Sequence, residues 1–236
     1  MHLKVAVCPH DSTKNKVNWL YFITYLSKQI GLDLTMEQCF EFKCYHDSFS
    51  YIDMSYSNPL DALRLHVERD FIPVAGNDNY DEVVIIANKD AEPSLGAIKG
   101  KKVLCVENQF ASYLGMRILK REGVNYELEY RDSWQNVLSD VARGIAPYGF
   151  LYKDFWEQVS NVSKGGVVPI YESDEKLSSH LIMLAPEFGQ YRQSILWALE
   201  KMPEDEEGAK IMEQLRISRW YPVESLDYLT KLIEEV

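Results

Sequence analysis

The chain has 236 residues, of which 46% are hydrophobic and 26% are charged, a balance typical of a folded globular protein. Its net charge of -11, with no basic block to offset it, argues against a nucleic-acid-binding protein. No run approaches the ~20 consecutive apolar residues of a membrane span, so we expect no membrane insertion.

The first region of the chain alternates between strands and helices. Residues 3–8 form an apolar run of strand length, 9–16 are predicted as a polar loop, and 17–30 have the spacing of an amphipathic helix that stops at Gly31. Pro59 is placed to begin another helix, where its missing N–H does no harm. Further extended segments are expected at 32–42, 51–56 and 71–75.

Residues 98–156 read as a compact strand–helix–strand–helix unit. An apolar strand at 103–106 is followed by a helix over 110–121 that is closed by Gly123, and a second strand at 126–130 leads to a helix over 133–143. The start of a helix that follows a buried strand offers free backbone N–H groups and a positive dipole end, which often hold small anions. The remaining expected elements are strands at 82–88 and 180–185, a helix at 191–201, and a helical end broken at Tyr221-Pro222.

The four cysteines leave two interpretations open. Cys39 and Cys44 are close enough in sequence to form a disulfide, whereas four free buried thiols would suit a reducing compartment. Cys8 lies near His10 and could ligate a metal, but spacing places no third or fourth ligand, so we expect no metal. His10, Asp11 and Ser12 are neighbours in sequence and are not expected to form a catalytic relay.

Taken in order, several short segments resemble the phosphate/phosphonate group of type II periplasmic solute-binding proteins. They are the opening strand with its Pro-containing loop, Ile52-Asp53-Met54-Ser55-Tyr56-Ser57-Asn58-Pro59, Ile86-Ala87-Asn88-Lys89-Asp90 before a Gly-Lys-Lys-Val strand, the helix end Val141-Ala142-Arg143-Gly144, and the run from Met202 to Gly208 that leads to Tyr221-Pro222. The resemblance implies an α/β fold of two lobes, with mixed sheets flanked by helices and a ligand cleft between the lobes. Lobe 1 would comprise residues 1–81 and 185–236, and lobe 2 residues 83–184, with crossings near 82–87 and 180–184.

The expected site departs from the family pattern. In the family, the second-lobe helix begins with a Ser-Thr-Ser-like run that grips a phosphono group, and the matching positions here are Phe110, Ala111 and Ser112. A Ser-His pair that assists the anion corresponds to Ser133 and Trp134. Because hydroxyl and imidazole groups are replaced, we expect inorganic phosphate and simple alkyl phosphonates to bind weakly, with Kd above roughly 10 μM.

Acidic and aromatic residues complete the expected site. Two acids that hold a ligand amine in the family correspond to Asp154 and Ser179. Aromatic faces beside one carboxylate suit a flat or cationic organic ligand, although these rings could equally pack in cores. The full set of expected ligand-binding residues is His10, Tyr45, His46, Tyr56, Ser57, Tyr80, Phe110, Ala111, Ser112, Ser133, Trp134, Tyr152, Asp154 and Ser179.

Three functions are compatible with this fold, and we favour a non-enzymatic solute-binding protein that closes two lobes on a small molecule. The alternatives are a cytoplasmic enzyme of cofactor biosynthesis and a cytoplasmic ligand-sensing protein. We expect no catalytic residues and no cofactor, a monomer, and an ABC permease or a sensor kinase as partner. The chain would be periplasmic or extracytoplasmic if a leader was removed, and cytoplasmic otherwise.

Overall fold

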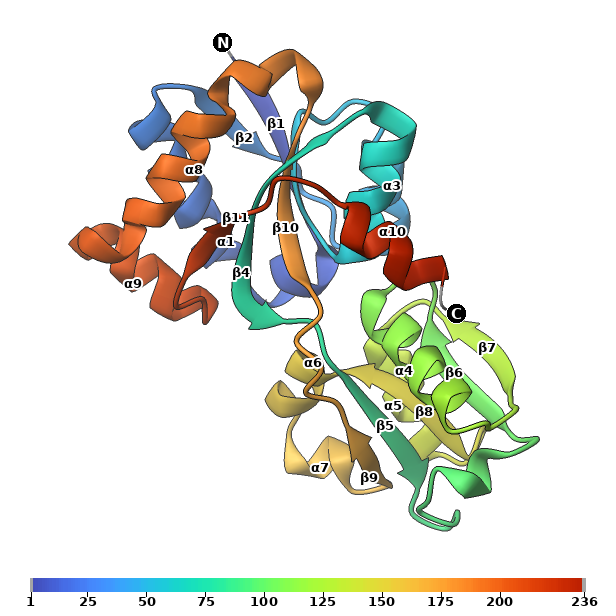
Figure 1. Cartoon of the computed structure of the whole chain (residues 1–236). Coiled ribbons are helices and arrows are strands. Elements are labelled where there is room, and N and C mark those ends of the chain that lie inside the picture. Colours follow the sequence, from blue (N-terminus) through green and yellow to red (C-terminus); the bar gives the residue numbers. More distant parts are fainter. Residues whose placement is uncertain (1, 235–236) are drawn as a thin grey trace. The chain divides into compact units, whose positions relative to one another are not determined.

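The computed structural model describes residues 2–234, which divide into two compact units (Figure 1). Of these residues, unit 1 comprises 2–80 and 178–230, and unit 2 comprises 81–177 and 231–234. Each unit contains one mixed sheet flanked by helices, so the predicted fold class is confirmed. Within residues 2–234, no helix is long and apolar enough to cross a membrane.

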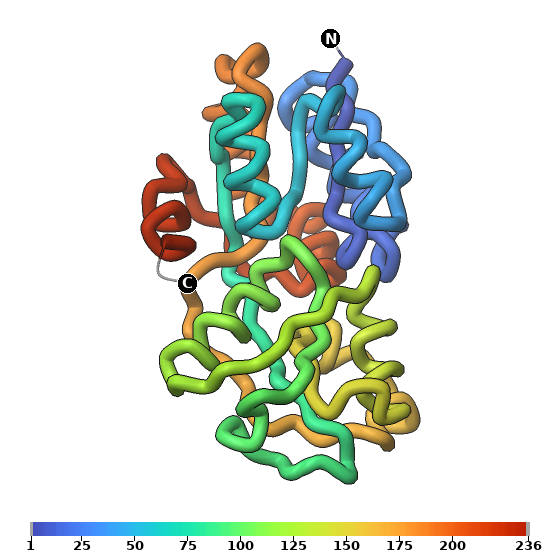
Figure 2. Tube along the Cα trace, turned by 90° about the vertical axis from the view of Figure 1, so that its right-hand side faces the viewer, coloured from blue at the N-terminus to red at the C-terminus, as the bar shows by residue number. Residues whose placement is uncertain are grey.

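The second crossing lies earlier than predicted. Residues 180–184 were expected in lobe 2, but they form strand β10 (Ser179–Leu184), which is hydrogen-bonded to β3 (Met54–Ser57) and β4 (Ile72–Tyr80) of unit 1. The chain therefore crosses before β10, between residues 177 and 178, and its first crossing lies between residues 80 and 81. Figure 2 shows the orange and red end of the chain returning beside the blue and teal beginning.

The sheet of unit 1 has the order β11-β4-β10-β3-β1-β2. Strand β1 (His2–Val7) runs parallel to β2 (Asp33–Met36) and β3, whereas β10 is antiparallel to β3 and β4, and β11 (Trp220–Pro222) is antiparallel to β4. Its helices are α1 (Pro9–Ile30), α2 (Phe42–Ser48), α3 (Pro59–Arg69), α8 (Arg192–Lys201), α9 (Glu206–Leu215) and the beginning of α10 (Asp227–Glu234). Short 3₁₀ turns at Pro186–Tyr191 and Met202–Glu204 flank α8.

Apolar residues on one face of this sheet hold α1, α8 and α9 in place. Trp19 and Leu26 of α1 join Leu199 of α8 and Ile211 of α9 in one buried cluster with β1 and β3. Helix α3 packs against β10, β3 and β4 and lies on the other side of the sheet in Figure 1. As predicted, α1 stops at Gly31, whose φ of 67° is a left-handed conformation that glycine adopts without strain.

Two local predictions in unit 1 are wrong. Residues 9–16 form the first turns of α1 instead of a loop, and a kink at Asn15 separates them from the amphipathic part. Proline is well suited to the first helical position, which Pro9 occupies, and this explains the early start. The extended segment ends at Met36, and Phe42 begins α2, which the sequence pattern did not reveal.

The sheet of unit 2 has the order β7-β6-β8-β5-β9. Strand β6 (Lys102–Val106) is parallel to β7 (Glu127–Arg131) and β8 (Tyr148–Tyr152), and β5 (Val83–Asn88) is antiparallel to β8 and β9 (Val167–Glu172). Its helices are α4 (Phe110–Arg121), α5 (Trp134–Ala142), α6 (Lys153–Gln158) and α7 (Asn161–Lys164), with a 3₁₀ turn at Gly96–Ile98. All six residues of β5 are buried, as expected for a central strand covered on both faces.

Helices α4 and α5 cover opposite faces of this sheet. Gly115 of α4 lies against the ring of Phe150, and Gly149 lies against Val137 of α5. Because successive side chains of a strand point to opposite faces, the neighbours Gly149 and Phe150 each mark one helix contact. The α4 contact is so close that a Cβ atom on residue 115 would lie 2.6 Å from Cγ of Phe150.

We therefore expect Gly115→Ala to destabilise the protein by about 1–3 kcal/mol, because the added methyl group forces α4 away from β8. Urea unfolding followed by circular dichroism measures the change. The control is Gly96→Ala, whose Cβ would meet no atom within 4 Å and should change the free energy of unfolding little. Equal stability of the two variants would contradict the close packing of α4 on β8.

Candidate functional site

The three parallel strands of unit 2 end at one edge of their sheet, and each is followed by a helix. Strands β6, β7 and β8 lead into α4, α5 and α6, so the starts of these helices gather at that edge. Phe110 begins α4, Trp134 begins α5 and Asp154 lies in the first turn of α6. The predicted ligand-binding residues of this region therefore share one sheet edge.

Trp134 has a polar atom without an intramolecular partner. The side chain is 4% exposed, and its indole Nε1–H has no hydrogen-bond partner among the described residues. Its ring lies 6.4 Å from that of Tyr152, whose hydroxyl donates to the buried Asp81 carboxylate at 3.1 Å. A buried donor without a partner costs free energy unless a ligand or water accepts from it.

The two neighbouring helix starts differ in their caps. Ser133 precedes α5, and its hydroxyl accepts from the backbone N–H of Asn136 at 3.2 Å, so it acts as an N-cap. At α4 the N-cap residue Gln109 makes no side-chain cap, so its side chain leaves the backbone N–H groups of Phe110, Ala111 and Ser112 without a capping acceptor. This helix start therefore offers backbone donors rather than side-chain donors.

The side chains at the start of α4 face the interior. Phe110 is 1% exposed and stacks on Tyr113 with ring centroids 5.6 Å apart. Ser112 is 2% exposed and donates its hydroxyl proton to the backbone oxygen of Val106 at 2.6 Å. The Ser112 hydroxyl can therefore only accept a further hydrogen bond. Asp154 of α6 is half-buried, and its carboxylate accepts from the side chain of Gln158 in the same helix.

In unit 1, the predicted residues form a buried network of hydroxyl groups. Tyr45 is fully buried, and its hydroxyl lies 2.6 Å from that of Ser57, which donates in turn to Ser55 at 2.8 Å. Burial raises the pKa of the Tyr45 hydroxyl well above its ordinary value, so it stays protonated. His46 contacts the buried carboxylate of Asp61 at 2.9 Å.

A second polar group in unit 1 centres on β10. His180 stacks on Tyr56 with centroids 5.1 Å apart, and it lies 3.3 Å from the carboxylate of Asp11 in the first turn of α1. The neighbouring Ser179 accepts from the backbone N–H of Asn77 at 3.0 Å. His10 is also buried in the first turn of α1, and Tyr80 ends β4 half-buried.

Sequence reasoning missed Asp61 and Asp81 as members of these groups, and it expected His180 to be a hydrogen-bonding cleft or packing residue without including it among the ligand-binding residues. The only available signal for Asp61 was its place just after Asn58-Pro59, because an acid in the first turn of a helix is favoured there. His180 and Asp81 carried no local pattern, since their partners come from distant segments of the chain.

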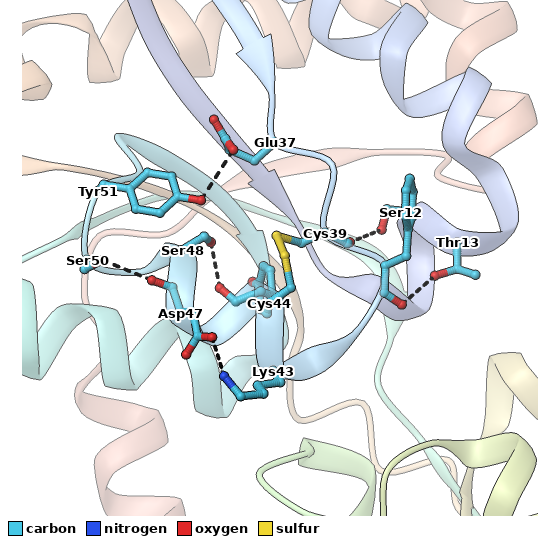
Figure 3. Close-up of a disulfide and its surroundings, with 12 residues drawn as sticks. Ser12, Thr13, Glu37, Cys39, Lys43, Cys44, Asp47, Ser48, Ser50 and Tyr51 are labelled. Atoms are coloured by element: carbon cyan, nitrogen blue, oxygen red, sulfur yellow. Dashed lines mark hydrogen bonds and ion pairs between the residues drawn. A yellow bond between two sulfur atoms is a disulfide. The ribbon is translucent and has the colours of Figure 1, made fainter.

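A disulfide joins Cys39 to Cys44 and ties the segment after β2 to α2 (Figure 3). Ser12 and Thr13 of α1 donate to the backbone oxygens of Cys39 and Phe40, each at 3.3 Å. The interpretation with four free thiols is therefore wrong. Cys8 and Cys105 are free and buried, and burial raises their pKa values to about 11 and about 12.

This fold, with two mixed α/β sheets and polar groups at the carboxyl ends of strands, is that of a type II periplasmic binding protein. Residues 5–228 match the family of ABC transporter, phosphonate, periplasmic substrate-binding proteins, and the chain belongs to that family. The predicted resemblance is thereby confirmed, and a transport binding protein is favoured over the enzyme and sensor alternatives. No curated protein is significantly similar to the chain in sequence.

Solved structures share the fold at low sequence identity. PhnD1 from Prochlorococcus marinus (MIT 9301), in complex with methylphosphonate, has a TM-score of 0.83 at 15% identity, covering 98% of this chain and 96% of that chain. XAC2383 from Xanthomonas citri bound to ATP has a TM-score of 0.76 at 13% identity, covering 99% and 96%. A binding protein component of an ABC phosphonate transporter (PA3383) from Pseudomonas aeruginosa has a TM-score of 0.79 at 14% identity, covering 99% and 85%.

The cysteine arrangement predicts a specific pattern of thiol reactivity. At about pH 8 both free thiols are protonated and shielded, so the native protein should react with no equivalent of Ellman's reagent. Denaturation with a chelator present should expose two thiols, and prior reduction should raise the count to all four cysteines. Four reactive thiols in the denatured, unreduced protein would contradict the disulfide.

Proposed function

We propose that this protein binds an organic solute bearing both acceptor oxygens and a positive or hydrogen-donating group. It would act as a monomer and deliver the solute to an ABC permease. The observation that carries the proposal is the buried Nε1–H of Trp134, which has no partner among the described residues and lies at the same sheet edge as the uncapped start of α4. Together these groups supply indole and backbone donors to acceptor oxygens.

The carboxylate of Asp154 would bind the positive or hydrogen-donating group of the solute. This carboxylate is half-buried in the first turn of α6, at the edge where α4 and α5 also begin. The rings of Trp134 and Tyr152 add aromatic faces, which favour flat or cationic groups. The ATP complex of XAC2383 supports the proposal, because the same fold holds an organic solute there.

An extracytoplasmic location is part of the same proposal. Proteins of this family are periplasmic, and the Cys39–Cys44 disulfide supports an oxidising compartment. Cys44 is exposed, so a reducing compartment would leave this disulfide accessible to cellular reductants.

The substitutions in the site predict weak binding of simple anions. Inorganic phosphate and methylphosphonate should bind with Kd above roughly 10 μM, because two side-chain hydrogen bonds at ~1–1.5 kcal/mol each are replaced by apolar contacts. Titration calorimetry of the wild type and of Trp134→His measures this directly, and the imidazole should raise anion affinity. Submicromolar binding by the wild type, or no gain in the variant, would show that these positions do not govern ligand choice.

The role of the Trp134 indole as a hydrogen-bond donor can be tested with an organic solute that binds the protein. A thermal-shift screen over phosphonates, amines and aromatic metabolites should yield a solute that stabilises the protein by ~2.7 kcal/mol at a hundredfold excess over Kd. Trp134→Phe keeps a ring but removes Nε1–H, and should weaken that solute about tenfold, the value of one hydrogen bond. Trp197→Phe, at an exposed position of unit 1, is the matched control and should bind normally. Unchanged affinity in Trp134→Phe would refute the role of the indole.

A further inference from the structure

Three chemically different ligand groups meet inside unit 1, apart from the helix starts of unit 2. They are the Cys8 thiol, the Asp11 carboxylate and the His180 imidazole, and one ligand atom from each lies within 4.8 Å of the other two. Cys8 is fully buried and His180 is 3% exposed, whereas the Asp11 side chain keeps 18% of its surface exposed. The group is therefore enclosed by protein and reachable from solvent on the Asp11 side.

The separation of the His180 and Asp11 ligand atoms fits a small tetrahedral ion. Bonds of about 2.0–2.3 Å around such an ion separate neighbouring ligand atoms by roughly 3.3–3.6 Å. Nε2 of His180 and Oδ2 of Asp11 are 3.3 Å apart, which already matches that separation. The sulfur of Cys8 lies within 4.8 Å of a ligand atom of each of these two residues.

Backbone structure holds the three groups in position. Cys8 is the N-cap of α1 and Asp11 lies one turn later, where both side chains share one face of the helix start. The backbone N–H of Cys8 donates to the oxygen of Tyr56 at 2.9 Å, and the Tyr56 ring stacks on His180. A stacked imidazole has little freedom to rotate, so it is preorganised to coordinate.

The donor set selects the class of metal. A thiolate sulfur excludes the hard cations Mg²⁺ and Ca²⁺, which take oxygen ligands, and sulfur with imidazole and carboxylate is typical of Zn²⁺. Two anionic ligands would balance the charge of a divalent ion, which a buried site requires. Coordination releases the thiol proton of Cys8 to solvent.

A nucleophile–base–orienter relay is the competing interpretation of the same residues. In a relay, the two different ring nitrogens of the histidine face the nucleophile and the acid. Here a single ring nitrogen of His180 lies within 4.8 Å of both the Cys8 sulfur and the Asp11 carboxylate. Convergence on one nitrogen is the geometry of ligands around a common ion.

We propose that Cys8, Asp11 and His180 form a binding site for one Zn²⁺-class ion, with the fourth coordination position left for a water molecule. All three residues belong to unit 1, whereas the solute site is proposed at the helix starts of unit 2, so this proposal does not depend on that one. Its sequence signature is a cysteine and an aspartate three residues apart, completed by a histidine from the distant strand β10.

Co²⁺ titration of the chelator-treated, tag-free protein tests the site. The experiment is done in oxygen-free buffer without added thiol, so that Cys39 and Cys44 stay bonded. We expect one equivalent of Co²⁺ to produce a thiolate-to-metal charge-transfer band and the visible bands of four-coordinate Co²⁺, and Zn²⁺ to displace both. Cys8→Ser should abolish the charge-transfer band, and Asp11→Asn and His180→Gln should each weaken binding by roughly tenfold or more.

The controls remove the same chemical groups elsewhere. Cys105→Ser removes the other free buried thiol, and His2→Gln removes an exposed histidine that pairs with Asp33. Both should bind Co²⁺ like the wild type. Absence of the charge-transfer band in the wild type, or equal affinity in Asp11→Asn and the wild type, would overturn the proposal. Asp11 is partly exposed and its replacement is isosteric, so this variant tests the site even if Cys8→Ser or His180→Gln fails to fold.

Discussion

In unit 1, strand β10 lies between β3 and β4 although it comes from a distant part of the sequence. Its pairing register determines where the polar side chains of that unit lie. Ile182 pairs with Tyr56, and Tyr56 pairs with Val7 of β1. The end of β1 and the beginning of β10 are thereby brought together, with the Tyr56 ring stacked on His180. A slip of one residue would turn the side chains of β10 to the opposite face, so the apolar residues that fix the register also fix the histidine.

Unit 2 depends on a different constraint, the common edge of three parallel strands. Its polar groups come from successive helix starts, and the neighbouring glycine and phenylalanine of β8 let α4 and α5 approach the sheet closely on opposite faces. Close packing makes the helix starts rigid, because a packed core resists displacement. The backbone donors of α4 and the indole of Trp134 are therefore preorganised by the packing of core residues in the sheet and its helices.

The parts of the fold that sequence predicts well are those with a local cause. The helix over Phe110–Arg121 has the predicted bounds because its apolar spacing and Gly123 act within one segment. Helix α2 was missed because its short sequence has no strong periodicity, and it is held by a disulfide to Cys39, whose backbone oxygen accepts a hydrogen bond from Ser12 of α1.

The same distinction between local and long-range causes applies to the candidate site. Local position placed Trp134 and Asp154 at helix starts, and the structure finds them there. Local position in the sequence could not reveal that Ser112 donates to Val106, or that Asp81 accepts from Tyr152, because these contacts depend on the path of the chain in space. The histidine of β10 is the extreme case, because its partners precede it by most of the length of the chain.

The chain belongs to its family although it is only 15% identical in sequence to a solved structure that shares its fold. Backbone features of such a site can therefore persist where side chains change. Backbone N–H groups at a helix start cannot be removed by substitution, apart from proline, so the capacity of α4 to meet an acceptor survives wide sequence change. Side chains at the same edge are free to vary, and we expect Phe110, Ala111 and Trp134 to stand where the family has hydroxyl and imidazole groups. Phe110 and Ala111 offer no side-chain hydrogen bond, whereas the indole of Trp134 keeps one donor and adds a large apolar face, so we expect the site to demand a different shape and polarity of its ligand. On the proposed function, we expect specificity to come from the difference in affinity between solutes, because a small symmetrical anion cannot use the aromatic surface that an organic solute covers.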